Sequence, residues 1–359
     1  MLVNLAFFDP RATGLATYAR HLIPQLQPLA PMLLTATPLP PLPHYPVPAN
    51  LSTAYGTRGH LRRLLWTQSC LPGLYRRLGA HLLFAPVPEA PLYCGCRFVV
   101  MVHDTIPLRF PNRRSRLHLY HRHWLPRVAR QAQQVICNSE ATARDVAQFL
   151  QVPAARIQPI LLAYDRDRFY PRAPAALPPP PARPYFLYLG RHNPYKNVGN
   201  LIAAFARLAA RHDCDLCLAG PTDARYTPSL RAQVAALGLG DRVQFLDYVD
   251  EAALPILLNQ ALALVFPSRW EGFGLPVLEA MACGTPVIAA QVSSLPEVAG
   301  EAALYIDPEK VAELAQAMTA VAQDASLRQQ LRDRGLARAA TFSWEKTGRA
   351  TVAVLERWL

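Results

Sequence analysis

Apolar segments alternate with amphipathic segments along most of the chain. Leu2–Phe8 and Tyr185–Leu189 are almost wholly apolar, which is typical of strands buried on both faces of a parallel sheet. Residues 15–26 and 198–208 follow them and repeat apolar side chains at the three-to-four spacing of a helix that packs on a core. The pattern predicts an α/β fold, in which parallel sheets are flanked by helices. Later predicted strands are Leu216–Ala219, Val243–Leu246, Leu262–Phe266, Val287–Ala290 and Ala303–Ile306.

The alternation is interrupted by a proline-rich segment at 173–184. Proline fixes φ and lacks an N–H donor, so such a stretch acts as a semi-rigid spacer. A chain of 359 residues is also too long for one ordinary core. We therefore expect two doubly wound, Rossmann-like domains, at 1–172 and 185–341, followed by a terminal helix at 342–359.

Composition places the chain among globular proteins, because 51% of its residues are hydrophobic and 17% are charged. The seven cysteines are scattered, and the N-terminal residues lack the pattern of a signal peptide, so we expect a cytoplasmic protein. Cys214 and Cys217 have the spacing of a metal or redox pair. They lie in a predicted strand and no second pair accompanies them, so we expect no metal site there.

The net charge of +12 is concentrated in the first half of the chain. Residues 1–172 hold 20 arginines against 7 acidic residues, whereas the remainder is close to neutral. Within 56–77, arginines alternate with leucine, tryptophan and tyrosine; they are Arg58, Arg62, Arg63, Arg76 and Arg77. Such a segment suits an anionic membrane surface, on which the protein would be peripheral. A helix packed on its own domain has the same pattern, so the sequence leaves both interpretations open.

The segment Trp270–Val287 has the most specific local pattern in the chain. It reads as a glycine-rich turn between an apolar strand and a short helix, with Pro276 in the first turn of that helix. Gly272 and Gly274 lack Cβ, so the backbone of this turn can approach a ligand closely. Free N–H groups at 275–278, together with the positive end of the helix, would then favour a phosphate.

Two carboxylates flank this turn, Glu271 on the loop and Glu279 about one turn into the helix. Carboxylates accept hydrogen bonds from hydroxyl groups. Phosphate donors with acceptors on both sides therefore suit a ligand that joins a sugar, a diphosphate and a ribose.

A second loop, at 190–197, carries two cations, Arg191 and Lys196, directly after a predicted strand. Cations held there would stabilise the negative charge that builds on a leaving diphosphate. Arginine can fork two phosphate oxygens, and lysine supplies a compact charge. We expect no Asp-x-Asp metal motif, and hence chemistry without a metal ion.

The string Glu-Gly-Phe-Gly-Leu-Pro at 271–276, with Glu279 eight positions after Glu271, resembles the E-x7-E signature of retaining GT-B glycosyltransferases of family 4. His103–Pro107 is similar to the His-Asp-x-x-Pro segment of family members that add mannose, rhamnose or related sugars. The resemblance implies the GT-B architecture, in which two Rossmann-like domains face each other across a cleft. It also implies that the terminal helix crosses back onto the first domain.

The resemblance implies roles for individual residues. Glu271 would hold hydroxyls of the donor sugar, and Glu279 those of the ribose. Arg191 and Lys196 would neutralise the diphosphate in place of a metal. His103, in the catalytic set, would line the acceptor side of the cleft. The other donor-binding residues that the resemblance implies are Gly14, Gly190, Gly220, Tyr248, Val249, Gly272, Phe273, Gly274, Leu275 and Pro276.

We therefore expect a retaining hexosyltransferase of polysaccharide biosynthesis. Its co-substrate would be a nucleotide-diphosphate sugar, preferably GDP-mannose, and no other cofactor is expected. Its acceptor would be a glycan, or a glycan on a polyprenyl pyrophosphate at the cytoplasmic face of the inner membrane. The alternative is a non-catalytic partner subunit of the same fold that binds nucleotide sugar or glycan. Nucleic-acid binding is not expected, because the basic charge comes without a stacking motif.

Overall fold

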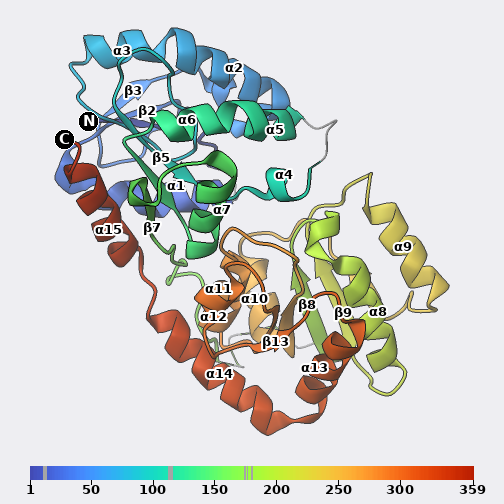
Figure 1. The fold of residues 1–359 in the computed structure, drawn as a ribbon. Helices are drawn as coiled ribbons and strands as arrows, with labels where there is room; N and C mark the ends of the chain where they lie inside the picture. Colours follow the sequence, from blue (N-terminus) through green and yellow to red (C-terminus); the bar gives the residue numbers. More distant parts are fainter. Residues whose placement is uncertain (11–13, 112–115, 174, 176, 179–180) are drawn as a thin grey trace. The chain divides into compact units, whose positions relative to one another are not determined.

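In a computed structural model, the described chain forms two compact units. Unit 1 comprises Met1–Ala163 with Ser343–Leu359, and unit 2 comprises Tyr164–Phe342. Each unit is built on one parallel sheet with helices packed around it, as Figure 1 shows. The prediction of two Rossmann-like, doubly wound domains is thereby confirmed. The structure describes residues 1–10, 14–111, 116–173, 175, 177–178 and 181–359.

The sheet of unit 1 has the strand order β3-β2-β1-β4-β5-β6-β7, and neighbouring strands are parallel. The order reverses between β1 and β4, and ligands bind beside such switch points in open α/β sheets. The strands are β1 (Leu2–Asn4), β2 (Met32–Thr35), β3 (His44–Pro46), β4 (Leu83–Ala85), β5 (Phe98–Val102), β6 (Gln134–Cys137) and β7 (Ile157–Pro159). The helices are α1 (Gly14–Gln25), α2 (Gly56–Ser69), α3 (Leu71–Arg77), α4 (Ile106–Arg109), α5 (Arg116–Leu119), α6 (Leu125–Gln131), α7 (Glu140–Leu150) and α15 (Trp344–Glu356).

The sheet of unit 2 has the order β10-β9-β8-β11-β12-β13, with its switch point between β8 and β11. Its central strands, at 185–189 and 263–266, are buried along their whole length. Strands of a parallel sheet covered on both faces have such continuous apolar sequences. The strands are β8 (Tyr185–Leu189), β9 (Asp215–Ala219), β10 (Val243–Phe245), β11 (Ala263–Phe266), β12 (Val287–Ala290) and β13 (Leu304–Ile306). The helices are α8 (Val198–Ala209), α9 (Thr227–Ala236), α10 (Ala253–Gln260), α11 (Leu275–Ala282), α12 (Leu295–Ala299), α13 (Val311–Gln323) and α14 (Ala325–Ala340).

The first boundary between the units lies at Ala163–Tyr164, ahead of the linker predicted at 173–184 rather than within it. The segment between these points is held by unit 2, where the N–H of Arg172 donates to Oδ1 of Asn259 at 2.8 Å. Proline content indicates where the chain is stiff, but long-range contacts decide to which unit a segment belongs. Residues 174, 176, 179 and 180 of the predicted linker lie outside the described residues.

The last helix, α15, belongs to unit 1. The indole of Trp344 stacks on the ring of His21, with the ring centroids 5.3 Å apart. Oγ1 of Thr347 donates to the carbonyl oxygen of Leu161 at 2.8 Å. Helix α15 therefore packs against α1, although the whole of unit 2 lies between the two helices in the sequence.

Candidate active site

The loops on either side of the switch point in unit 2 carry the predicted donor site. The loop after β8 holds Arg191 and Lys196, and the loop after β11 holds Glu271. Because β8 and β11 are parallel neighbours, both loops leave the same edge of the sheet. The two cations and the first carboxylate therefore lie at one edge of the sheet.

Gly190 and Gly220 bring the neighbouring loops into direct contact. A Cβ on Gly220 would lie 1.9 Å from the carbonyl oxygen of Gly190, and its φ is +152°, so no side chain fits. The N–H of Gly220 donates to the carbonyl oxygen of Asp247 at 2.8 Å, which attaches the loop after β10. Tyr248 and Val249, the predicted base contacts, follow on that loop, the first exposed and the second half-buried.

Lys196 ends a 3₁₀ turn that Asn197 holds in place. Asn197 has a φ of +63°, and its side-chain amide donates to the carbonyl oxygens of Pro267 at 3.2 Å and Pro308 at 2.6 Å. These two bonds offset the cost of the left-handed conformation. Nζ of Lys196 lies 5.5 Å from the ring centroid of Phe266, so the ammonium group is also held against an aromatic face.

The ammonium of Lys196 and the carboxylate of Glu271 form an ion pair. Nζ lies 2.6 Å from Oε1 and 2.9 Å from Oε2, and the side chains are 13% and 9% exposed. Two serines after β12 fix the Glu271 backbone. Ser293 Oγ accepts its N–H at 3.0 Å, and Ser294 Oγ lies 3.0 Å from its carbonyl oxygen and 2.8 Å from that of Phe273. Sequence reasoning missed these serines, although their place after a predicted strand was a usable signal.

Helix α11 begins after Gly274, as predicted, and has a proline in its first turn. Gly274 has a φ of +102°, which side chains with a Cβ rarely adopt. The N–H groups of Val277 and Leu278 donate to the Gly274 carbonyl oxygen at 2.9 Å and 3.4 Å. The prediction that these N–H groups are free is therefore wrong, because the first turn closes on itself. The N–H of Leu275 has no hydrogen-bond partner among the described residues.

Glu279 lies in α11, half-buried, and its carboxyl group has no hydrogen bond or ion pair to any described residue. Burial raises the pKa of its carboxyl to about 7, an effect that Arg168 opposes and Asp165 reinforces. Nε of Arg168 is fixed by donating to the carbonyl oxygen of Glu251 at 3.0 Å. Glu279 therefore has unused acceptor capacity, which suits a hydroxyl ligand. Sequence reasoning missed Asp165 and Arg168 because they lie far earlier in the chain.

Arg191 is exposed on the same loop as Lys196. Its charge helps to lower the pKa of Asp223 to about 2, after the larger effect of hydrogen bonds from Arg225. The guanidinium of Arg191 has no hydrogen bond or ion pair among the described residues, so it can meet an anion from solution.

Two Asp-x-Asp spacings occur in the sequence, Asp165–Asp167 and Asp213–Asp215, which corrects the expectation that none would be present. Asp213 and Asp215 both pair with Arg242, at 3.7 Å and 3.2 Å. Oδ1 of Asp165 accepts the N–H of Asp167 at 3.1 Å. Within the described ranges, no group of three or more His, Cys, Asp or Glu side chains is placed to hold a metal ion.

Unit 1 holds the other two predicted site residues, His103 and Gly14. Nε2 of His103 lies 2.9 Å from the carbonyl oxygen of Pro86, and its ring meets that of Tyr18 edge-on at 4.8 Å. Burial lowers the pKa of His103, so the neutral ring donates from Nε2 and keeps Nδ1 as an acceptor. Gly14 is exposed at the start of α1, and residues 11–13 lie outside the described residues.

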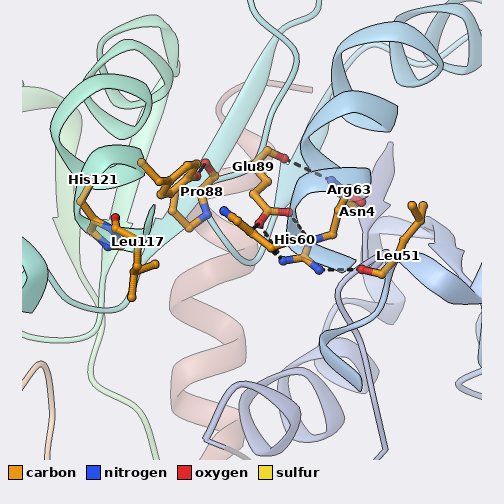
Figure 2. Close-up of polar contacts among 9 residues, drawn as sticks. Asn4, Leu51, His60, Arg63, Pro88, Glu89, Leu117 and His121 are labelled. Atoms are coloured by element: carbon orange, nitrogen blue, oxygen red, sulfur yellow. Dashed lines mark hydrogen bonds and ion pairs between the residues drawn. The ribbon is translucent and has the colours of Figure 1, made fainter. Parts of the chain in front are cut away.

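Figure 2 shows the surroundings of Arg63, one of the arginines predicted to face a lipid surface. Arg63 is buried instead, and its guanidinium forks the carboxylate of Glu89 while Nη1 donates to the carbonyl oxygen of Leu51 at 2.6 Å. Nδ1 of His60 lies 3.0 Å from the same carboxylate. The interpretation of Arg63 as a membrane contact is therefore wrong, because the helical repeat turns it inward beside His60.

The opposite face of α2 is exposed and combines charge with apolar side chains. Leu61 and Leu65 are 54% and 63% exposed, and Arg58 and Arg62 are exposed beside them. One face of α2 packs on its own domain, and the other has the composition of an interfacial helix. None of the helices that the structure describes combines the length and the hydropathy of a membrane span.

Comparison with known proteins gives the same assignment as the motifs. The family described as glycosyl transferases group 1 matches residues 170–338, and glycosyltransferase family 4 matches residues 12–168. The chain is 35% identical over 230 residues to O-antigen chain mannosyltransferase B of Escherichia coli, covering 62% of this chain and 60% of that protein. It is 32% identical over 242 residues to the MMP alpha-(1->4)-mannosyltransferase of Mycolicibacterium hassiacum, covering 64% and 56%. The alignments thus span less than two thirds of either relative.

Solved structures share the fold over nearly the whole chain. Sucrose-phosphate synthase from Thermosynechococcus elongatus has a TM-score of 0.78 at 21% identity, covering 99% of this chain and 98% of that one. Anabaena HepE in complex with UDP-glucose has a TM-score of 0.75 at 19% identity, covering 100% of both chains. The chain belongs to the GT-B glycosyltransferases of family 4.

Proposed function

We propose that the chain is a retaining glycosyltransferase that moves a hexose, mannose in the first place, from a nucleotide-diphosphate sugar to a glycan. The observation that carries this proposal is the switch point of unit 2. A buried cation and carboxylate, Lys196 and Glu271, lie there on adjacent loops. The relatives described above are named mannosyltransferases, and HepE was solved with UDP-glucose, which supports this donor class and this sugar.

The donor would meet three kinds of group in unit 2. Lys196 and Arg191 would bind the diphosphate, because both are cations of one loop, the first held in an ion pair and the second exposed. Glu271 and Glu279 would accept hydrogen bonds from the sugar and the ribose. The residues of unit 2 proposed to complete the donor site with backbone and packing contacts are Gly190, Gly220, Tyr248, Val249, Gly272, Phe273, Gly274, Leu275 and Pro276.

The proposed reaction proceeds on one face of the donor sugar. The bond between the anomeric carbon and the diphosphate oxygen breaks, and the acceptor oxygen forms its bond to the same face of that carbon. The acceptor proton passes to the leaving phosphate oxygen, so no side chain is assigned as general base. Lys196 and Arg191 would stabilise the charge on the leaving group, which makes a metal ion unnecessary. His103, with Nδ1 as an acceptor, would contribute from the acceptor side.

We further propose that the acceptor is a glycan carried on a polyprenyl pyrophosphate, and that the protein is cytoplasmic and peripheral on the inner membrane. The support is the basic first half of the chain and the exposed face of α2. There Arg58 and Arg62 flank Leu61 and Leu65.

The test starts from binding. Melting temperature is measured with GDP-mannose, UDP-glucose, GDP and UDP, and transfer is followed as release of nucleoside diphosphate. We expect a nucleotide sugar to raise the melting temperature, and Glu271→Gln to remove most turnover while the protein stays folded. Glu301→Gln is the matched control, because Glu301 is an exposed carboxylate in the same unit. A protein that no nucleotide sugar stabilises, or a Glu271→Gln variant with full activity, would overturn the proposal.

A further inference from the structure

The Lys196–Glu271 ion pair joins the two groups that the proposed donor needs separately. Both carboxylate oxygens of Glu271 face Nζ of Lys196, within 2.9 Å. Two of the three ammonium hydrogens of Lys196 thereby bond the carboxylate, and each carboxylate oxygen of Glu271 uses one of its acceptor sites for Lys196. In this state neither group is fully available to a ligand.

The surroundings make it costly to separate only one partner. Glu271 and Lys196 are 9% and 13% exposed. Burial raises the pKa of the nearby Tyr188 phenol, and the Glu271 charge adds to this effect. A buried charge that loses its partner without replacement is strongly destabilised, whereas exchange for another set of hydrogen bonds is tolerated. Lys196 can therefore turn to a phosphate at low cost only if something else donates to Glu271.

We infer that this ion pair makes the enzyme distinguish an intact nucleotide sugar from a bare nucleoside diphosphate, an inference that rests on the proposed function. An intact donor supplies phosphate oxygens to Lys196 and sugar hydroxyls to Glu271, so both charges are compensated. A bare diphosphate satisfies Lys196 and leaves Glu271 buried without a partner. The pair thus couples the diphosphate and sugar subsites energetically.

The same exchange gives a direction to the catalytic cycle. After the anomeric bond to the diphosphate has broken and the sugar has joined the acceptor, hydroxyl donors leave Glu271. The carboxylate then competes with the phosphate for Lys196, and re-forming the ion pair displaces the nucleoside diphosphate. Glu271 is in this respect a specificity residue against the product, in addition to its contact with the sugar.

The experiment measures the dissociation constants of GDP and GDP-mannose, or of UDP and UDP-glucose if those are the nucleotides that bind, by titration calorimetry. We expect Glu271→Gln to bind the bare diphosphate at least about fivefold more tightly than the parent, at the lower end of typical coupling. The amide cannot hold the ammonium as a carboxylate does. The same variant should lose most of the preference for the intact sugar. Glu301→Gln, which removes one exposed acidic charge from the same unit, should leave both constants unchanged.

A double-mutant cycle tests whether the tighter binding of the bare diphosphate by Glu271→Gln depends on Lys196. In a Lys196→Gln background, Glu271→Gln should no longer tighten binding of the bare diphosphate, because the competing cation is gone. The inference is overturned if Glu271→Gln binds the bare diphosphate as weakly as the parent or more weakly, or if the gain persists without Lys196. Failure of the parent to bind any nucleotide sugar would instead overturn the proposed function.

Discussion

Oγ of Ser294 lies 3.0 Å from the carbonyl oxygen of Glu271 and is wholly buried. The serine comes from the loop after β12, so the neighbouring strand of the sheet fixes the backbone that presents the Glu271 carboxylate. The ion pair with Lys196 therefore depends on the loops after three strands, β8, β11 and β12. The sequence motifs identify only the loops after β8 and β11.

Replacing Ser294 by alanine should weaken both folding and catalysis. The change removes the donor to two buried carbonyl oxygens, so the free energy of unfolding should fall by about 1–3 kcal/mol in a urea titration. Turnover should fall as well, because the Glu271 loop loses its support. Ser229→Ala is the control, since Ser229 is exposed on α9 and bonds only its own first turn. A Ser294→Ala variant as stable and active as the parent would show that this contact does not support the site.

Activity should persist in excess EDTA. In the proposed reaction, Lys196 and Arg191 neutralise the leaving diphosphate, so no divalent ion is required. Initial rates with and without chelator, and after addition of manganese or magnesium, check this expectation. Loss of activity on chelation and recovery with manganese would refute it.

The Arg63–Glu89 ion pair should make unit 1 sensitive to acid. Burial alone would raise the pKa of Glu89, but Arg63 and His60 outweigh it, so the folded pKa lies below the ordinary value of 4.5. A lowered pKa means that this contribution is complete above about pH 4.5 and is lost as the pH falls through the folded pKa. Urea titrations between pH 7 and pH 3 should show the loss, and Glu89→Gln should flatten it.

At neutral pH, Glu89→Gln should reduce stability by roughly 3–5 kcal/mol, because it leaves the Arg63 guanidinium buried without its counter-charge. Arg62→Gln, one position away on α2 but exposed, should change stability by less than about 0.5 kcal/mol. Equal effects at the two positions would contradict the assignment of Arg63 to the interior.

The exposed face of α2 should bind anionic vesicles in a manner that weakens with salt. Each basic residue near such a surface contributes roughly 1 kcal/mol, and the attraction fades within a Debye length. Replacing Arg58 and Arg62 by glutamine should reduce co-sedimentation with anionic vesicles without changing affinity for the nucleotide sugar. Arg122→Gln with Arg127→Gln, a pair of exposed arginines elsewhere in unit 1, serves as the charge-matched control. If both double variants lose vesicle binding equally, the binding depends on the net charge of the protein and not on the exposed face of α2.

Features with a local cause could be predicted from the sequence. The helix start at Gly274 and the strands of unit 2 follow from proline and glycine rules and from apolar runs, which operate over a few residues. The placement of Lys196 and Glu271 at one edge follows from strand order in a parallel sheet. These rules do not need knowledge of distant contacts.

Features with a long-range cause could not be predicted. Ser294 and Arg168 reach the site from other loops. The place of Ser294 after a predicted strand indicates the edge of the sheet but not its partner, and no local pattern marks Arg168. Arg63 has the same local spacing as the exposed Arg62, and only the position of Glu89 shows which of the two is buried.

The assignment of α15 to unit 1 has a consequence for synthesis of the protein. Unit 2 is one continuous stretch, Tyr164–Phe342, so all of it has been synthesised before Trp344 is added to the chain. Unit 1 has to wait for its last segment, and until then the surface of α1 that receives Trp344 is uncovered. Domains usually fold in the order in which they are translated. In this chain the unit that begins first is the one that is finished last.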